Sequence, residues 1–348
     1  MHIDEVETPA VAIDLDLVEQ NLRRWQAYCD QHGIANRPHI KTHKIVELAR
    51  RQIELGAVGI TCQKLGEAEV MADAGLNDIF LPYNIVGDAK LARLVALARR
   101  VRLRVSCDDI AVARGLSRAA AAAGLTLEVL VECDTGLGRC GVQSPAAAAD
   151  LAGQIARLPG LAFAGLMTYP TGEGSNAFMA EARRLIEARG LAVPVISGGG
   201  TPQMWQAHTA PAFTEHRAGT YIYHDRYTVQ RGAATFADCA LRVLATVVSR
   251  PTPARAVLDA GSKALTSDLL GLAGHGTVVG FPDAHIARLS EEHGVVEFPK
   301  ECPWQIGQRV AIIPNHACVV SNLFDRVFAC RGDEVEAVWP VAARGRVQ

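Results

Sequence analysis

The strongest constraint on this chain is a repeated alternation of short apolar runs with longer amphipathic stretches. Eight runs have strand character, and they cover residues 36–40, 58–62, 78–83, 101–106, 127–133, 162–168, 193–198 and 215–223. Helices are predicted after a first one at 16–32, and they cover 43–55, 64–74, 88–99, 109–123, 145–157, 177–189 and 202–208. Strands that alternate with helices of this length are typical of βαβ units and a parallel sheet.

The number of these units predicts an α/β fold in which the strands close into an eight-stranded TIM-type (β/α)8 barrel. An open, doubly wound sheet is the alternative. Such a sheet usually has fewer units, and no GxGxxG motif follows the first predicted strand. The helix at 109–123 has the clearest propensity, because it contains an alanine run at 119–123.

The pattern changes after about residue 236, where short β-rich segments separated by Gly or Pro replace the helical period. These segments are Leu241–Val248, Ala256–Leu258, Gly276–Val279, Gly294–Phe298 and Arg309–Ile313. The short apolar run Ala10–Asp14 is a strand that could join them. We therefore expect a barrel domain over 16–235 and a mostly-β C-terminal domain made of 1–15 plus 236–348.

Composition excludes several classes of protein. The formal net charge of −2 gives no electrostatic basis for binding nucleic acid or an anionic membrane. No run of about 18 uncharged apolar residues occurs, so no membrane span is predicted. The acidic N-terminus does not resemble a secretory signal, and nine cysteines without a CxxC pair favour a reducing compartment. We expect a cytoplasmic protein.

A basic segment, 37–44, ends the first predicted strand and contains Lys41. The carboxyl ends of barrel strands form the face on which barrel enzymes place their chemistry. A confined lysine flanked by cationic groups, here Arg37, His39 and His43, can lose its proton and form a Schiff base. Thr42 is predicted to cap the following helix and Lys44 to point outward from its first turn. The alternative is a basic strand-to-helix loop without chemistry.

A glycine-rich loop, Ser197–Pro202, follows the seventh predicted strand. Its three glycines allow backbone amides to approach an anion, and Pro202 suits the first position of a helix. Phosphate sites after strands seven and eight recur in barrels. The alternative is a plain tight turn.

The eighth predicted strand carries Arg217, Gly219, Tyr221 and Tyr223 at a period of two, so these residues would share one face. Charged and aromatic groups that face a barrel mouth are costly to bury, which favours a ligand there. The alternative is a polar strand edge that faces outward.

His316 and Cys318 are two residues apart after an apolar strand, so both would project to the same side. Imidazole and thiolate together suit Zn²⁺, with further positions left to water or substrate. A buried cysteine beside an ordinary histidine is the alternative.

These segments occur together, in order, in a known family. The chain resembles the D-threonine aldolase and D-serine dehydratase group, which shares its barrel with alanine racemase (fold type III pyridoxal-phosphate enzymes). The resemblance runs over nearly the whole length, and it is carried by Arg37–Lys44, Gly66–Glu69, Glu132–Val142, Ser197–Thr201, Arg217–Asp225, Asp259–Asp268 and Pro314–Cys318.

The resemblance implies a pyridoxal 5'-phosphate enzyme with Lys41 as the lysine that bonds the cofactor. Other cofactor contacts would come from Gln63, Arg139, Tyr169, Gly199, Gly200, Thr201, Arg217, Gly219 and Thr220. His316 and Cys318 would bind a divalent metal, which could be Zn²⁺, Mn²⁺ or Mg²⁺. Family members are usually homodimers in which the second domain of one subunit lies close to the barrel mouth of the other.

The chain departs from the family pattern at two places. Many relatives carry a histidine shortly after the tyrosine that corresponds to Tyr169, whereas this chain continues with Pro170-Thr171-Gly172. The acid/base group is therefore open, with Asp225, His224 and a water as candidates. The best-known D-threonine aldolases carry a carboxylate where this chain has Cys318, and a cysteine there is typical of the dehydratases.

Among the activities that the resemblance implies, the first is that of a lyase that cleaves a D-3-hydroxy amino acid of the D-threonine type to glycine and an aldehyde. The segments Asp259–Asp268 and Ser290–Gly294 are similar to those of the aldolases. A dehydratase of the D-serine or D-3-hydroxyaspartate type, which releases a 2-keto acid and ammonia, uses the same groups. A racemase and a non-catalytic cofactor-binding protein are further alternatives.

Overall fold

The computed structural model describes residues 1–348 and divides into two compact units. One unit consists of Trp25–Lys41, Leu48–Gly219 and Gly345–Gln348, and we call it the barrel unit. The other consists of Met1–Arg24, Thr42–Glu47 and Thr220–Arg344, and we call it the β unit. The domain limits expected from the sequence, 16–235 and 1–15 with 236–348, stay a prediction.

The barrel unit is built on an eight-stranded parallel sheet in the order β2-β9-β8-β7-β6-β5-β4-β3. Its strands are β2 (Ala35–Asn36), β3 (Ile60–Thr61), β4 (Asp78–Leu81), β5 (Arg102–Cys107), β6 (Leu127–Cys133), β7 (Leu161–Thr168), β8 (Val195–Gly199) and β9 (Glu215–Arg217). A parallel bridge between His39 and Thr61 joins the two ends of this order. The predicted barrel of eight parallel strands is thereby confirmed.

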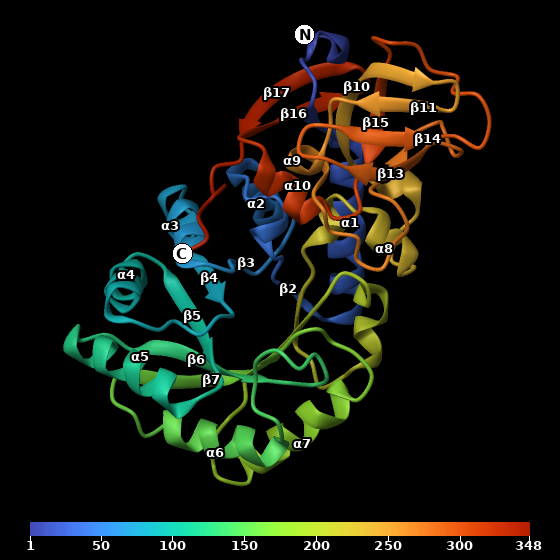
Figure 1. Cartoon of the computed structure of the whole chain (residues 1–348). Helices are drawn as coiled ribbons and strands as arrows, with labels where there is room; N and C mark the ends of the chain where they lie inside the picture. The colour runs from blue at the N-terminus through green and yellow to red at the C-terminus, as the bar shows by residue number, and fades with distance from the viewer. The chain divides into compact units, whose positions relative to one another are not determined.

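Helices follow the strands and lie outside them, as α4 to α7 show in Figure 1. They are α2 (Val46–Glu54), α3 (Leu65–Asp73), α4 (Asp88–Ala98), α5 (Ile110–Ala122), α6 (Pro145–Ile155) and α7 (Ser175–Glu187), after α1 (Leu15–His32). Helix α5 begins where Asp109 accepts the Ala111 backbone N–H at 2.7 Å. No helix in the structure combines the length and apolarity that crossing a membrane requires.

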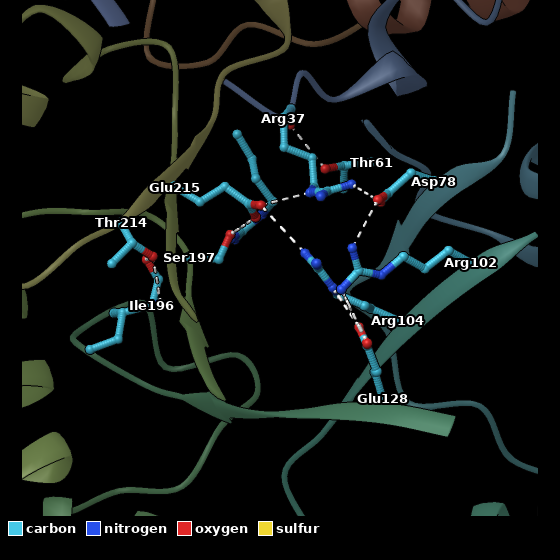
Figure 2. A network of polar contacts seen from close by, with 11 residues as sticks. Arg37, Thr61, Asp78, Arg102, Arg104, Glu128, Ile196, Ser197, Thr214 and Glu215 are labelled. Atoms are coloured by element: carbon cyan, nitrogen blue, oxygen red, sulfur yellow. Dashed lines mark hydrogen bonds and ion pairs between the residues drawn. The ribbon is translucent and has the colours of Figure 1, made fainter. Parts of the chain in front are cut away.

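The interior of the barrel has an apolar layer and a charged layer. Phe80, Leu130, Ala164 and Met167 form a buried apolar cluster between neighbouring strands. Burial of such side chains contributes about 1.5–3 kcal/mol each. The charged side chains are paired across strands (Figure 2), as buried charges must be if the fold is to be stable.

The β unit is built on a nine-stranded, mostly antiparallel sheet with the path β13-β14-β11-β10-β1-β16-β17, and β15 pairs with β10 and β12. Its strands are β1 (Ala10–Asp14), β10 (Leu241–Thr252), β11 (Arg255–Leu258), β12 (Thr277–Val278), β13 (His285–Leu289), β14 (Gly294–Glu297), β15 (Arg309–Ile313), β16 (Arg326–Arg331) and β17 (Glu334–Pro340). The predicted N-terminal strand, β1, lies between β10 and β16. A mostly-β second domain is therefore confirmed.

Short helices complete both units. They are α8 (Arg226–Gln230), α9 (Ser262–Leu265), α10 (Ala317–Leu323) and the 3-10 helices Ile3–Glu5, Ile40–Thr42, Met204–Thr209, Thr220–Ile222 and Phe236–Asp238. The stretch expected as a helix at 202–208 is the 3-10 helix Met204–Thr209.

Candidate active site

Lys41 follows the first barrel strand within the 3-10 helix Ile40–Thr42 and is half-buried. The expected arrangement of its neighbours is wrong in two respects. Thr42 does not cap the next helix, which begins only at Val46. Lys44 does not point outward: it is buried, has a φ of 56°, and donates from Nζ to Asn322 Oδ1 at 2.7 Å. The tight 3-10 turn, which delays the helix, accounts for both differences.

A pocket lies at the carboxyl ends of the barrel strands. Five predicted cofactor residues converge on it, and its lining is His39, Lys41, Gln63, Pro82, Arg139, Met167, Tyr169 and Arg217. Sequence reasoning assigned no cofactor contact to His39, Pro82 or Met167. His39 carried a usable signal, because it precedes Lys41 by two residues, and its Nε2 lies 3.0 Å from Gln63 Oε1.

Two basic side chains of the pocket lie near the Tyr169 ring. Lys41 Nζ is 5.5 Å from the ring centroid, and Arg139 Cζ is 5.3 Å from it. Both distances fit cation–π contact. Arg139 belongs to a loop organised by Asp134, whose carboxylate accepts the backbone N–H groups of Gly136, Leu137 and Gly138. These bonds lower the pKa of Asp134 and fix the loop that carries the arginine.

The glycine loop after β8 is held against the segment after β7. Thr171 donates its backbone N–H to Gly199 O and accepts the Gly199 N–H on Oγ1, both at 2.8 Å. A Cβ at Gly198 would lie 2.5 Å from that Oγ1, and Gly200 has a φ of 119°. Side chains are therefore excluded from this loop by space at one position and by backbone conformation at the other. The Gly199 N–H is thereby already used within the protein.

Two predictions about the phosphate region need correction. Pro202 does not start a helix, since it lies in a turn before the 3-10 helix that begins at Met204. Strand eight ends at Arg217, so the alternating face that would include Gly219, Tyr221 and Tyr223 does not form. The chain turns instead into the 3-10 helix Thr220–Ile222, and both tyrosines are buried.

The turn still brings the two predicted phosphate loops of the barrel unit together. The Gly219 backbone N–H donates to Thr201 Oγ1 at 3.3 Å. Beside them, the His216 imidazole is fully buried and its Nε2 lies 3.1 Å from Gly200 O. Burial lowers the pKa of His216 to about 4, so the ring is neutral and donates to that carbonyl.

The predicted metal pair lies in the β unit. His316 is the residue before α10, and Cys318 belongs to the first turn of that helix. The start of a helix therefore brings the two side chains together, and not the alternation along a strand that the sequence predicted. His316 Nδ1 lies 2.8 Å from Asp268 Oδ2. Burial lowers the pKa of His316, but its bonds to Cys318 and Asp268 outweigh burial and raise it to about 9.

Hydroxyl groups surround the Cys318 sulfur. Thr42 Oγ1 lies 3.2 Å from Cys318 Sγ, and Thr220 Oγ1 lies 3.5 Å from it. The Tyr223 hydroxyl is buried without a hydrogen-bond partner, and burial, with a smaller contribution from Cys318, raises its pKa. Sequence reasoning missed all three as neighbours of Cys318, although it had assigned Thr220 to the phosphate.

This donor set fits a metal ion that takes only two ligands from the chain. No group of three or more His, Cys, Asp or Glu side chains in the structure is placed to hold a metal. The His316 ring presents Nδ1 to Asp268, an arrangement typical of ligating histidines, and a metal would lie between the imidazole and the Cys318 sulfur that it contacts. The remaining positions would go to water or substrate, as in a catalytic site.

Asp225, a candidate acid/base group, is bonded to the backbone through both carboxylate oxygens, and burial raises its pKa. Its Oδ1 accepts the Thr228 N–H at 2.9 Å and its Oδ2 accepts the Ala317 N–H at 3.0 Å. It caps α8 and fixes the first residue of α10. His224, the other candidate, has a φ of 48° and a buried Nδ1 without a partner, and burial lowers its pKa to about 4.

Comparisons with known proteins support the same fold and site. The family model described as alanine racemase, N-terminal domain, matches residues 13–227, and the putative serine dehydratase domain matches residues 240–330. A D-threonine aldolase from Arthrobacter sp is 38% identical over 98% of this chain and 93% of its own length.

Solved structures are similar over the whole chain. D-threonine aldolase from Filomicrobium marinum has a TM-score of 0.90 and 35% identity, over 99% of this chain and 97% of its own. D-threo-3-hydroxyaspartate dehydratase from Delftia sp. HT23 has a TM-score of 0.89 and 30% identity, over 97% of this chain and 98% of its own. That dehydratase is also solved with a histidine replaced by alanine and, in a metal-free form, with a cysteine two positions later replaced by alanine.

The chain has the features of the alanine racemase-type barrel proteins. These features are the lysine, the glycine loop and the barrel, with a mostly-β domain after them in sequence. Within that class the chain belongs to the family of D-threonine aldolase and D-serine dehydratase, as its sequence predicts.

Proposed function

We propose that this chain is a pyridoxal-phosphate- and metal-dependent lyase that cleaves a D-3-hydroxy amino acid of the D-threonine type to glycine and an aldehyde. The observation that carries the proposal is the pocket in which Lys41 faces Tyr169, Arg139 and Arg217. Relatives named D-threonine aldolase and 3-hydroxy-D-aspartate aldolase, 38% and 33% identical, support this choice of reaction.

The pocket fits pyridoxal phosphate. Its lining contains one lysine and two arginines, Lys41, Arg139 and Arg217, whose basic groups suit an anionic cofactor. Lys41 would hold the cofactor, with Gln63, Arg139, Tyr169 and Arg217 around its ring. Gly199, Gly200, Thr201, Gly219 and Thr220 would receive the phosphate. When bound, the cofactor acts as an electron sink for the bond that breaks at Cα.

The chain's own groups then divide the remaining work. The Lys41 amine is the group able to form the bond to the cofactor and to exchange a proton beside it. The Arg139 and Arg217 cations favour anionic groups in the pocket. We assign Asp225 a structural part, because both of its carboxylate oxygens accept backbone N–H groups and it does not line the pocket with Lys41.

We also propose that His316 and Cys318 hold a divalent metal that lowers the pKa of the substrate hydroxyl. The dehydratase relative with its metal-free cysteine variant supports the proposal, because its histidine and cysteine have the same spacing. Thiolate favours Zn²⁺, and Mn²⁺ and Mg²⁺ are the alternatives. We further propose a cytoplasmic homodimer that binds a small-molecule substrate and no nucleic acid or membrane.

Removal of one metal donor should lower metal binding and activity together. We expect Cys318→Ala to lose most of its tightly bound metal and to lower turnover by at least about 100-fold, comparable to strong chelation of the unchanged protein. Metal content and turnover measure the effect. Cys330→Ala, which removes another buried thiol of the β unit, is the matched control and should keep both. Full activity of metal-free Cys318→Ala would contradict the assignment.

Product analysis with D-threonine separates the candidate reactions. The aldolase gives glycine and acetaldehyde, and this is the expected result. A 2-keto acid and ammonia would establish the dehydratase, which the cysteine at the metal position favours. Interconversion of D- and L-amino acids that survives chelation would establish a racemase. Binding of pyridoxal phosphate without turnover of any of these substrates would establish a non-catalytic cofactor-binding protein.

A further inference from the structure

Charged side chains form a network inside the barrel unit (Figure 2). The network contains four cations, Arg37, Arg102, Arg104 and Arg217, and three anions, Asp78, Glu128 and Glu215. The buried carboxylate of Glu132 also acts electrostatically on Arg217. The position of Arg217 matters, because Arg217 also lines the pocket with Lys41.

Three of the arginines contact carboxylates directly, and Arg217 does not. Arg37 Nε lies 2.7 Å from Glu215 Oε2, and Arg104 Nε lies 2.8 Å from Glu128 Oε2. The Arg217 guanidinium donates only to neutral oxygens, namely Ser197 Oγ and Thr168 O, the latter at 2.8 Å. Arg217 is therefore a cation that lines the pocket without direct contact to a carboxylate.

The Ser197 hydroxyl connects this cation to the nearest carboxylate. It donates to Glu215 Oε1 at 2.6 Å and accepts from Arg217. The direction of both bonds is fixed, because a guanidinium has no acceptor and an ionised carboxylate has no donor. Ser197 and Glu215 are register partners on β8 and β9, as are Gly199 and Arg217, so the sheet itself sets this geometry.

Gly199 lies beside Arg217 on the neighbouring strand. A Cβ at Gly199 would lie 3.5 Å from one Arg217 terminal nitrogen and 3.4 Å from Arg217 Cβ. The arginine therefore has one side bounded by the backbone of β8 and one end held by the Ser197 hydroxyl. Phe80 bounds it further, with its ring centroid 5.5 Å from Arg217 Cζ.

We infer that Ser197 and Glu215 are a positioning pair that keeps the Arg217 cation in the cofactor pocket and at a distance from direct carboxylate contact. The inference rests on the proposed function, because it assumes that pyridoxal phosphate occupies the pocket. Without the hydroxyl, the guanidinium would move to Glu215 and form an ion pair away from the cofactor. The pocket would then lose part of its positive potential, and basic groups of the cofactor would hold protons more tightly.

The test compares Ser197→Ala with Ser106→Ala in protein reconstituted with pyridoxal phosphate. Ser106 is a matched control, because it is a fully buried barrel serine whose hydroxyl has no partner. We expect Ser197→Ala to weaken cofactor affinity about tenfold, the loss of one hydrogen bond to a charged group. The pH midpoint of the visible cofactor band should rise by about one unit. Ser106→Ala should change neither quantity.

A double-mutant cycle shows whether the effect passes through Arg217. In an Arg217→Lys background, Ser197→Ala should change cofactor affinity and the pH midpoint much less than in the unchanged protein. Equal effects in both backgrounds, or a Ser197→Ala protein with unaltered affinity and midpoint, would overturn the inference. If Ser197→Ala does not fold, Glu215→Gln replaces it with the same two readouts.

The two proposals fail in distinguishable ways. If the unchanged protein shows no visible cofactor band that borohydride abolishes, the proposed function fails and the inference fails with it. If that band is present and the Ser197 variant matches the Ser106 control, only the positioning pair is wrong.

Discussion

Lys41→Ala should abolish the visible absorbance of the reconstituted protein and lower turnover by at least about 1,000-fold. Lys41 is the lysine of the pocket, with its Nζ 5.5 Å from the Tyr169 ring centroid. No other lysine lines that pocket, so none is placed to replace it. The measurements are the absorbance spectrum before and after borohydride and the initial rate with D-threonine.

A surface lysine provides the control for this experiment. Lys90→Ala, in α4, removes the same charge outside the pocket and should leave spectrum and rate unchanged. A Lys41→Ala protein that retains a borohydride-sensitive band would show that another amine bonds the cofactor. That result would remove the basis of the proposed function.

Arg37→Met should destabilise the folded protein by about 3–5 kcal/mol, the usual loss when one partner of a buried ion pair is removed. Arg37 is buried and contacts Glu215 Oε2 at 2.7 Å and Asp78 Oδ1 at 2.5 Å (Figure 2). The methionine would remove the nearer of the two cations that form ion pairs with the buried Glu215 carboxylate. Arg104, 3.7 Å away, would be the one that is left. Denaturant unfolding without cofactor measures the change in free energy.

The control for Arg37 is an ion pair on the surface. Arg100 and Asp73 contact each other but are both exposed, so Arg100→Ala should cost less than about 1 kcal/mol. A loss of similar size in both variants would contradict the expected role of the buried network. It would indicate that Glu215 is neutralised by protonation when Arg37 is absent.

The sequence was sufficient for the barrel because the barrel depends on local periodicity. Each of the eight predicted strands has a counterpart in β2 to β9, and β1 joins the second sheet as expected. The errors lie where the chain makes a tight turn. A 3-10 helix at Ile40–Thr42 and another at Thr220–Ile222 replaced a predicted helix start and the end of a predicted strand.

The candidate site was predictable where residues follow strand ends, and it was not where partners meet across the fold. Lys41, Tyr169 and Arg217 could be placed at the barrel mouth from their positions after strands. The neighbours of Cys318 could not be predicted in this way, because one of them, Thr42, is 276 residues away in sequence. His316 and Cys318 were paired correctly for the wrong reason, since a helix start brings them together.

The double use of Asp225 has a consequence for protein engineering. One carboxylate caps α8 and receives the first N–H of α10, the helix that carries Cys318. Attempts to change metal preference by substitution will naturally begin with the residues closest to the metal donors, and Asp225 is among them in space. A variant there would shift two helix starts at once. Libraries that aim at a new metal should therefore hold Asp225 constant, keep Thr220 for the phosphate, and vary Thr42 and Tyr223.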